Sequence, residues 1–443
     1  MKYILDVKIM PKENYIKVKG SIKDIEIPNG ANVFCLNENF KISKLTSNGK
    51  DIDYIHDKNK SNPPYDLVSK PVILKTPLKE FDFEYDGYMP EIIGGVNQIN
   101  EDIVELAMYS GWYPKVLLYT ENTEEIDFNI ERRGFEFELT VELPPEYSFA
   151  ANAEIKNIDT LSNGKTVYSL LSYGVDRGDI ALFASNKVIK IERTLNEITV
   201  FAICPPAMEK KNTLKLEILI EAQERMTELL GEPKIKQSTC YINRPCGGWG
   251  YVRTSIVLMP GITDENDEAL KDLSREAAIH FSSLDIHELA HYWWGIASST
   301  GSNDWINEGG AEYTMLCIKK DMLGLENYNE FTGGYIERIN ACTSDEAIIE
   351  TPNHGEIREI NSYTKTAIMY IGAEIRFGKE NLFKFLRKFY EQNKAKGNAD
   401  TDRFLDLCEQ ILGKEAREYF NWLLYAKGWQ NIDIQKDILL YCE

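Results

Sequence analysis

The sequence lacks long uncharged apolar runs and is poor in positive charge. No stretch reaches the roughly 18 uncharged apolar residues that a membrane-spanning helix needs. The first segment, MKYILDVKIMPKENYIKVKG, carries a charge every few positions, unlike a secretory signal. Lysine and arginine number 50 against 70 aspartates and glutamates, a formal net charge of -20. Because an acidic surface repels phosphate groups, we expect no nucleic acid and no membrane among the partners.

Cysteine motifs are also absent. The eight cysteines are scattered through the 443 residues without CxxC spacing. In a long chain without a secretory signal, this pattern predicts reduced thiols rather than a disulfide framework. We therefore expect a cytoplasmic protein.

Histidine is scarce and unevenly distributed. Only five histidines occur, and two of them, His287 and His291, fall within DIHELAHYWWG at 285–295. Residues four apart lie on one face of a helix, so both imidazoles can reach one ion. Glu288 would stand beside them to activate a water molecule. Taken alone, the pair also fits an amphipathic helix that happens to carry two histidines.

A second segment supplies the ligand that the histidine pair lacks. Sixteen residues, 292–307, separate His291 from Glu308, which lies in the phrase WINEG. That gap is long enough to leave one helix, turn through 301–304 and begin an antiparallel helix. A carboxylate there completes a His, His, Glu set with an open fourth position, as catalytic zinc sites require. The combined pattern predicts a site for one zinc ion.

The first part of the chain, residues 1–205, predicts a β-rich domain. It contains short alternating runs of apolar and polar residues such as YIKVKGSI and FEFELTVEL. Asn-Gly turn signals at 48–49 and 163–164 separate such runs. We expect a saddle-shaped sheet or a sandwich here.

The second part, residues 206–443, predicts a mostly helical domain. An amphipathic segment at 214–231 is followed by two strand-like segments, 236–243 and 251–260, and helical periodicity then dominates. One long helical pattern, 268–294, carries the histidine pair. The fold class is therefore α+β, with the candidate site in the second domain.

The two motifs together resemble a known family. HELAHYWWG followed by WINEG is similar to the zinc-binding segments of the aminopeptidase N family of gluzincin metallopeptidases, which also contains leukotriene hydrolase. The segments at 362–390 and 418–429 resemble other parts of that family's catalytic domain, so the similarity covers about 205–430. Before that the match is in outline only, with YSGWYPK at 109–115 similar to a turn of the family's β-saddle domain. The resemblance implies a thermolysin-like catalytic domain with a small edge sheet.

The resemblance also implies a role for each matching residue. His287, His291 and Glu308 would bind zinc. Glu288 would be the general base that takes a proton from the zinc-bound water and passes it to the leaving amine. Tyr363 would stabilise the oxyanion with its hydroxyl group.

Glu312 lies one helical turn after Glu308. Two interpretations stay open for it. It either accepts the outer N–H of a ligand histidine and orients the ring, or it is an ordinary solvated glutamate on the helix surface.

The sequence departs from the family where a free amino terminus would bind. The family signature Gly-Ala-Met-Glu-Asn is replaced by residues 246–248 of RPCGGWG, so the glutamate that would bind the substrate amine is absent. Gly247 and Gly248 either let a substrate backbone pair along an edge strand or form a flexible turn. Glu105 is our candidate for a replacement carboxylate. We also expect the chain to be a short form without the family's C-terminal helical domain.

These features predict a zinc metallopeptidase that acts on peptides, with aminopeptidase-like cleavage as the leading mode. Two alternatives stay open. A peptidase with another cleavage preference fits the missing amine-binding glutamate. A peptide-binding or scaffold protein without turnover fits the altered segment 244–248, whereas the intact ligand set favours an enzyme. The sequence indicates no particular oligomeric partner.

Overall fold

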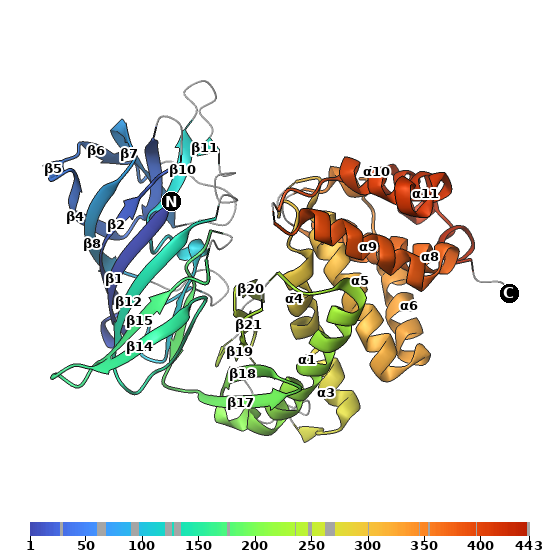
Figure 1. Ribbon diagram of the computed structural model, residues 1–443, viewed down its shortest axis with the longest axis horizontal. Coiled ribbons are helices and arrows are strands. Elements are labelled where there is room, and N and C mark those ends of the chain that lie inside the picture. Colours follow the sequence, from blue (N-terminus) through green and yellow to red (C-terminus); the bar gives the residue numbers. More distant parts are fainter. Residues whose placement is uncertain are drawn as a thin grey trace. The chain divides into compact units, whose positions relative to one another are not determined.

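The fold is seen in a computed structural model (Figure 1). It describes residues 1–440 apart from 27–29, 60–67, 90–96, 120–125, 128–133, 175–177, 235, 247–249, 262–270, 300, 345, 353–354 and 396. Within these residues, no helix is both long enough and apolar enough to span a membrane.

The chain divides into two compact units whose segments alternate near the predicted boundary at residue 205. The β-rich unit comprises Met1–Glu192, Phe201–Glu209 and Gln237–Asn266. The helical unit comprises Arg193–Val200, Lys210–Lys236 and Asp267–Glu443. A β-rich part followed by a mostly helical part is the fold class expected from the sequence, and it is confirmed.

The largest sheet of the β-rich unit has eight strands, and its core face follows from the alternation of the sequence. In β1 (Lys2–Met10), Tyr3, Leu5 and Val7 are buried while the residues between them are less so. β1 pairs in parallel with β12 and antiparallel with β2. The strand order is β14 (Glu154–Thr160), β15 (Thr166–Leu171), β12 (Glu136–Leu143), β1, β2 (Tyr15–Lys23), β8 (Phe81–Tyr88), β4 (Phe40–Ser47) and β5 (Lys50–Asp51).

Two smaller sheets complete this part of the unit. One has the order β11 (Ile126–Asp127), β10 (Lys115–Tyr119), β3 (Ala31–Asn37), β7 (Ser69–Leu78) and β6 (Tyr54–His56). The other has the order β13 (Ser148–Ala151), β16 (Leu182–Ser185) and β9 (Ile103–Leu106). Strands β17 (Ile189–Leu195) and β18 (Ile198–Cys204) follow in the chain.

The turn signals act as the sequence predicts. Ser47 pairs with Lys50, so Asn48 and Gly49 form a two-residue hairpin loop. Both have positive φ, 51° and 73°. Asparagine and glycine tolerate this conformation, which matches the twist of the flanking strands.

The strand-like segment at 251–260 is two strands rather than one. β20 (Tyr251–Arg253) and β21 (Ile256–Met259) run antiparallel, and β21 pairs in parallel with β19 (Thr239–Asn243). Ser255 between them has a φ of 61°, a left-handed conformation that the apolar run does not predict.

Helices dominate the second unit. They are α1 (Glu209–Leu230), α3 (Arg275–Phe281), α4 (Ser283–Trp294), α5 (Asp304–Leu323), α6 (Leu325–Ala341), α7 (Glu356–Arg358), α8 (Thr366–Phe377), α9 (Lys379–Asn393), α10 (Thr401–Leu412) and α11 (Lys414–Tyr425). A π-helical segment, Glu359–Lys365, joins α7 to α8.

The long helical pattern expected for 268–294 is wrong as a single helix. α3 and α4 meet at Ser282, whose hydroxyl donates to the carbonyl of Ala278 at 2.7 Å. Serine that bonds back to the preceding turn bends helices, and here the break separates α3 from the helix that carries the motif. Residues 262–270 lie outside the described part of the chain.

α4 is fixed against both α1 and the connection to α5. Lys215 of α1 donates to Asp285 of α4 at 3.0 Å, and the side chains of both are almost fully buried. Asn307 of α5 accepts from the backbone N–H groups of Ile296 (3.1 Å) and Ala297 (3.0 Å). These contacts set where α5 begins relative to the end of α4.

A glycine pair lets α5 pack closely on two sides. A Cβ atom added at Gly310 would lie 2.3 Å from the indole of Trp294, at the end of α4. One added at Gly309 would lie 2.1 Å from the side chain of Thr366, at the start of α8. Both distances are far below van der Waals contact, so only glycine allows these approaches.

We predict that Gly310→Ala lowers the free energy of unfolding by about 1–3 kcal/mol, because the added methyl must displace the Trp294 ring. Gly334→Ala on α6 is the matched control. Nothing lies within 4 Å of its added Cβ, so it should stabilise by about 0.5–1 kcal/mol. Denaturant unfolding followed by helical circular dichroism measures both. Equal stability of the two variants would contradict the close packing.

Candidate metal centre

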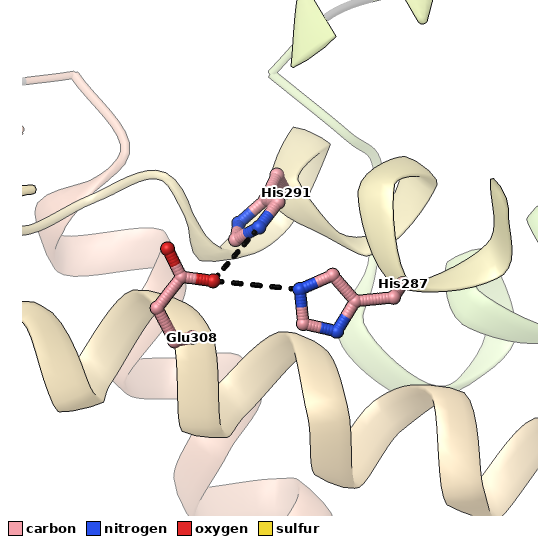
Figure 2. Close-up of side chains that lie close together, drawn as sticks. All are labelled: His287, His291 and Glu308. Atoms are coloured by element: carbon pink, nitrogen blue, oxygen red, sulfur yellow. Dashed lines mark ion pairs between the residues drawn. The ribbon is translucent and has the colours of Figure 1, made fainter. Parts of the chain in front are cut away.

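Three side chains from two neighbouring helices converge on one point. His287 and His291 project from the same face of α4, with ring centroids 5.0 Å apart and planes at 85°. Glu308 projects toward them from the first turns of α5 (Figure 2). Its Oε2 atom lies 3.4 Å from Nε2 of His287 and 3.3 Å from Nε2 of His291. Among the described residues, this is the one group of three side chains spaced to hold a metal ion.

The two distances from Oε2 of Glu308 to the imidazole nitrogens fit a tetrahedral zinc ion. Zinc ligands at about 2.0–2.2 Å from a tetrahedral centre lie about 3.3–3.6 Å from one another. Oε2 of Glu308 is also buried and accepts no hydrogen bond from the described part of the chain. A buried carboxylate oxygen in this position is costly without a partner, and a cation removes that cost. Two imidazoles and one carboxylate are a donor set that zinc prefers.

The electrostatics keep Glu308 ionised. Burial opposes its ionisation, but His291 and His287 outweigh this effect and hold the pKa of its carboxyl well below the usual range. A ligand carboxylate must be deprotonated to bind a metal, and the two histidines must give up their protons when they bind it.

Glu312 stands behind His287. Its Oε2 atom lies 2.6 Å from Nδ1 of His287, and its other oxygen accepts from the hydroxyl of Tyr335 on α6. With Nδ1 donating to Glu312, the lone pair of Nε2 faces Glu308, which is the tautomer that ligates a metal. Burial favours the neutral acid, but His287 and Tyr335 outweigh it and lower the pKa of Glu312.

The π-helical segment brings Tyr363 to the same place. Its ring stacks on that of His287, with centroids 5.5 Å apart and planes at 15°. Burial, followed by the charges of Glu308 and Glu288, raises the pKa of the Tyr363 hydroxyl, so it stays protonated at neutral pH. Glu288 itself is 8% exposed. Local π-helical turns are frequent at functional sites.

Two further residues, Arg358 and Asp304, lie at the site and were not predicted from the sequence. Arg358, at the end of α7, donates to Oδ2 of Asp304 at 2.5 and 2.9 Å and to Oε1 of Glu308 at 2.9 Å. It also donates to the Tyr363 hydroxyl at 3.3 Å. Burial and the charge of Glu308 raise the pKa of Asp304 to about 7, and Arg358 opposes this rise. The only sequence signal was the proximity of Arg358 to Tyr363, five residues later.

The proposed substrate-amine residues belong to the β-rich unit. Glu105 is fully buried and pairs with Arg244, its oxygens accepting at 2.5 and 2.9 Å, and one also accepts from the Tyr251 hydroxyl at 3.1 Å. A substrate ammonium would have to compete with that arginine, and the role of Glu105 stays a prediction. Gly247 and Gly248 lie outside the described residues.

We predict that Glu312→Gln weakens zinc binding about tenfold or more, because the amide is a poorer partner for the outer nitrogen of His287. The matched control is Glu337→Gln at an exposed position on α6. Competition with a chromogenic chelator measures both dissociation constants. The same zinc affinity in both variants would show that Glu312 does not support the ligand.

No family model and no curated protein sequence matches the chain significantly, but solved structures do. A mutant of the M1 zinc metallopeptidase from Deinococcus radiodurans, bound to a Tyr-Ser-Ala substrate, is 16% identical at a TM-score of 0.69, covering 97% of this chain and 94% of that one. Another structure of that enzyme is 16% identical at a TM-score of 0.68, and the match covers 97% of this chain and 93% of that one. A two-domain M1 zinc metallopeptidase mutant bound to L-arginine is 15% identical at a TM-score of 0.68, and the match covers 97% of this chain and 94% of that one. The chain therefore has the fold of the M1 zinc metallopeptidases, the aminopeptidase N family that its HELAH and WINEG motifs resemble.

Proposed function

We propose that the protein is a zinc-dependent metallopeptidase. The observation that carries the proposal is the convergence of His287, His291 and Glu308, whose ligand atoms all lie within 4.8 Å of one another. Zinc held there would polarise a peptide carbonyl and make a water molecule more acidic. Peptide hydrolysis further requires a base for that water and a donor for the oxyanion, and the site holds a residue for each.

Glu288 is the proposed general base. It directly follows His287 on α4, and its charge acts on the pKa of both His287 and Tyr363, which supports a position near the metal centre. In the reaction it would take a proton from the attacking water and deliver that proton to the leaving amine. Its low exposure, 8%, would limit competing exchange with bulk water.

Tyr363 is the proposed oxyanion donor. Its stacking on His287 fixes the ring relative to the metal ligands. Since the hydroxyl stays protonated at neutral pH, it can donate a hydrogen bond to the carbonyl oxygen as negative charge develops there.

Aminopeptidase-like cleavage is the mode that we propose first. The solved relatives were captured with a Tyr-Ser-Ala substrate and with L-arginine. A tripeptide substrate and a free amino acid, the kind of product that aminopeptidase action releases, support a substrate that presents its amino terminus to the metal. The fold resemblance supports the same mode.

One observation favours a different cleavage preference. Glu105, the candidate for an amine-binding carboxylate, is fully buried and bonded through both oxygens. If no other carboxylate takes its place, a charged substrate amine would bind without compensation, which is costly in a closed site. Peptides with a blocked amino terminus would then be the better substrates.

We predict that Glu288→Gln keeps stoichiometric zinc but loses turnover by about a hundredfold or more, because the amide cannot accept a proton. His291→Ala should instead lose the metal itself. Zinc content by elemental analysis and hydrolysis of an amino-acid arylamide separate the two effects. Near-normal turnover of Glu288→Gln would show that Glu288 is not the base.

We predict that unblocked amino-acid arylamides and short peptides are cleaved faster than their N-acetylated forms when zinc is present. The physical reason is that aminopeptidase action depends on recognition of the free ammonium group. The measurement is kcat/KM across matched pairs of free and blocked substrates. Preference for the blocked forms would replace the aminopeptidase assignment, and a zinc-loaded protein that cleaves neither would favour the peptide-binding alternative.

A further inference from the structure

Arg358 contacts both Glu308 and Tyr363. In the described part of the chain, it is the only positively charged side chain other than the two histidines that contacts Glu308. We propose that Arg358 is a positioning residue for both groups, with Asp304 holding it in place. The inference rests on the proposed zinc site and adds a residue that the HELAH and WINEG motifs do not contain.

Glu308 is the first of the two groups that Arg358 contacts at the site. Arg358 donates from Nη2 to Oε1 of the carboxylate at 2.9 Å, while Oε2 lies between the two imidazoles and accepts no hydrogen bond from the residues that the structure describes. The two oxygens are thus divided between two tasks. Arg358 fixes the rotation of the carboxylate so that a single oxygen is presented to the metal. Partners that orient a ligand in this way strengthen metal binding.

Tyr363 is the second group that Arg358 contacts at the site. Nη1 of Arg358 donates to the phenolic oxygen at 3.3 Å. A hydroxyl that accepts from an arginine must direct its own proton elsewhere, because the guanidinium group has no acceptor. Arg358 therefore leaves the Tyr363 proton available to a substrate oxyanion. The same planar fork reaches a carboxylate and a phenol at once, which a lysine ammonium does not do.

Asp304 holds the guanidinium group of Arg358 in place. Both Nε and Nη2 of Arg358 donate to its Oδ2 atom, at 2.9 and 2.5 Å, and the Asp304 side chain is 2% exposed. Asp304 lies one turn before Glu308 on α5, so one helix presents both carboxylates to the same arginine. This pairing holds a guanidinium group close to a site for a dication, where repulsion would otherwise push it away.

We predict that Arg358→Ala weakens zinc binding about tenfold to a hundredfold, the range for lost ligand-orienting partners. Arg358→Lys keeps a cation beside Asp304 and Glu308 and should recover most of that loss. Arg417→Ala is the matched control, since Arg417 on α11 also pairs with two carboxylates, Asp406 and Glu409 of α10, away from the candidate metal site. The measurement is the zinc dissociation constant by chelator competition, which does not require turnover.

Zinc affinity of Arg358→Ala equal to that of Arg417→Ala would overturn the positioning of Glu308. If Arg358→Ala does not fold, Asp304→Asn carries the test, and it should weaken zinc binding about tenfold. Wild-type affinity in Asp304→Asn would then contradict the proposal. A wild-type protein that binds zinc but hydrolyses no peptide would refute the peptidase function alone and leave this affinity test intact.

The Tyr363 contact is tested by a double-mutant cycle. Arg358→Lys should lower kcat in the otherwise wild-type enzyme but change it far less in the Tyr363→Phe background, because the contact is already absent there. KM should move little in either background. Independent, multiplicative losses in kcat would show that Arg358 does not act through Tyr363.

Discussion

The site depends on one buried carboxylate oxygen. Oε2 of Glu308 lies between two imidazole nitrogens and accepts no hydrogen bond from the described residues. A cation at the point on which the three ligand atoms converge would remove the cost of burying it. Much of the surrounding packing serves to bring α5 close enough to α4 for this convergence. The glycine pair at 309–310 permits the approach, and Asn307 ties the start of α5 to the end of α4.

The side chains around the candidate metal centre form an inner set, which would touch a metal or a substrate, and an outer set that contacts the inner one. Glu312 supports His287 from behind, and Tyr335 in turn bonds to Glu312. On the other side, Arg358 links Glu308 to Asp304 and to Tyr363. His287, Glu308 and Tyr363 therefore each have an outer partner that restricts their rotation. Such restriction matters for catalysis, because misplaced ligands lose metal affinity and misplaced donors lose their effect on the transition state.

The sequence predicted the fold class and the convergence of His287, His291 and Glu308 because these follow from local periodicity and from spacing along the chain. Helix periodicity places His287 and His291 on one face, and the gap before Glu308 sets the turn. The break between α3 and α4 at Ser282 and the turn at Ser255 were not predicted. Each depends on a single residue within a sequence pattern that otherwise continues through it. Arg358 and Asp304 could not be predicted, because they lie 54 residues apart and meet only after α5 and α7 have packed together.

The central claim is that two histidines and one glutamate hold a single zinc ion. X-ray absorption spectroscopy at the zinc edge of the purified protein tests it directly. The account predicts one equivalent of zinc with nitrogen and oxygen neighbours only, at about 2.0–2.2 Å. In the His291→Ala variant that signal should be lost. A shell of sulfur neighbours at about 2.3 Å would place the metal on cysteines and contradict the account, as would a wild-type protein that retains no zinc.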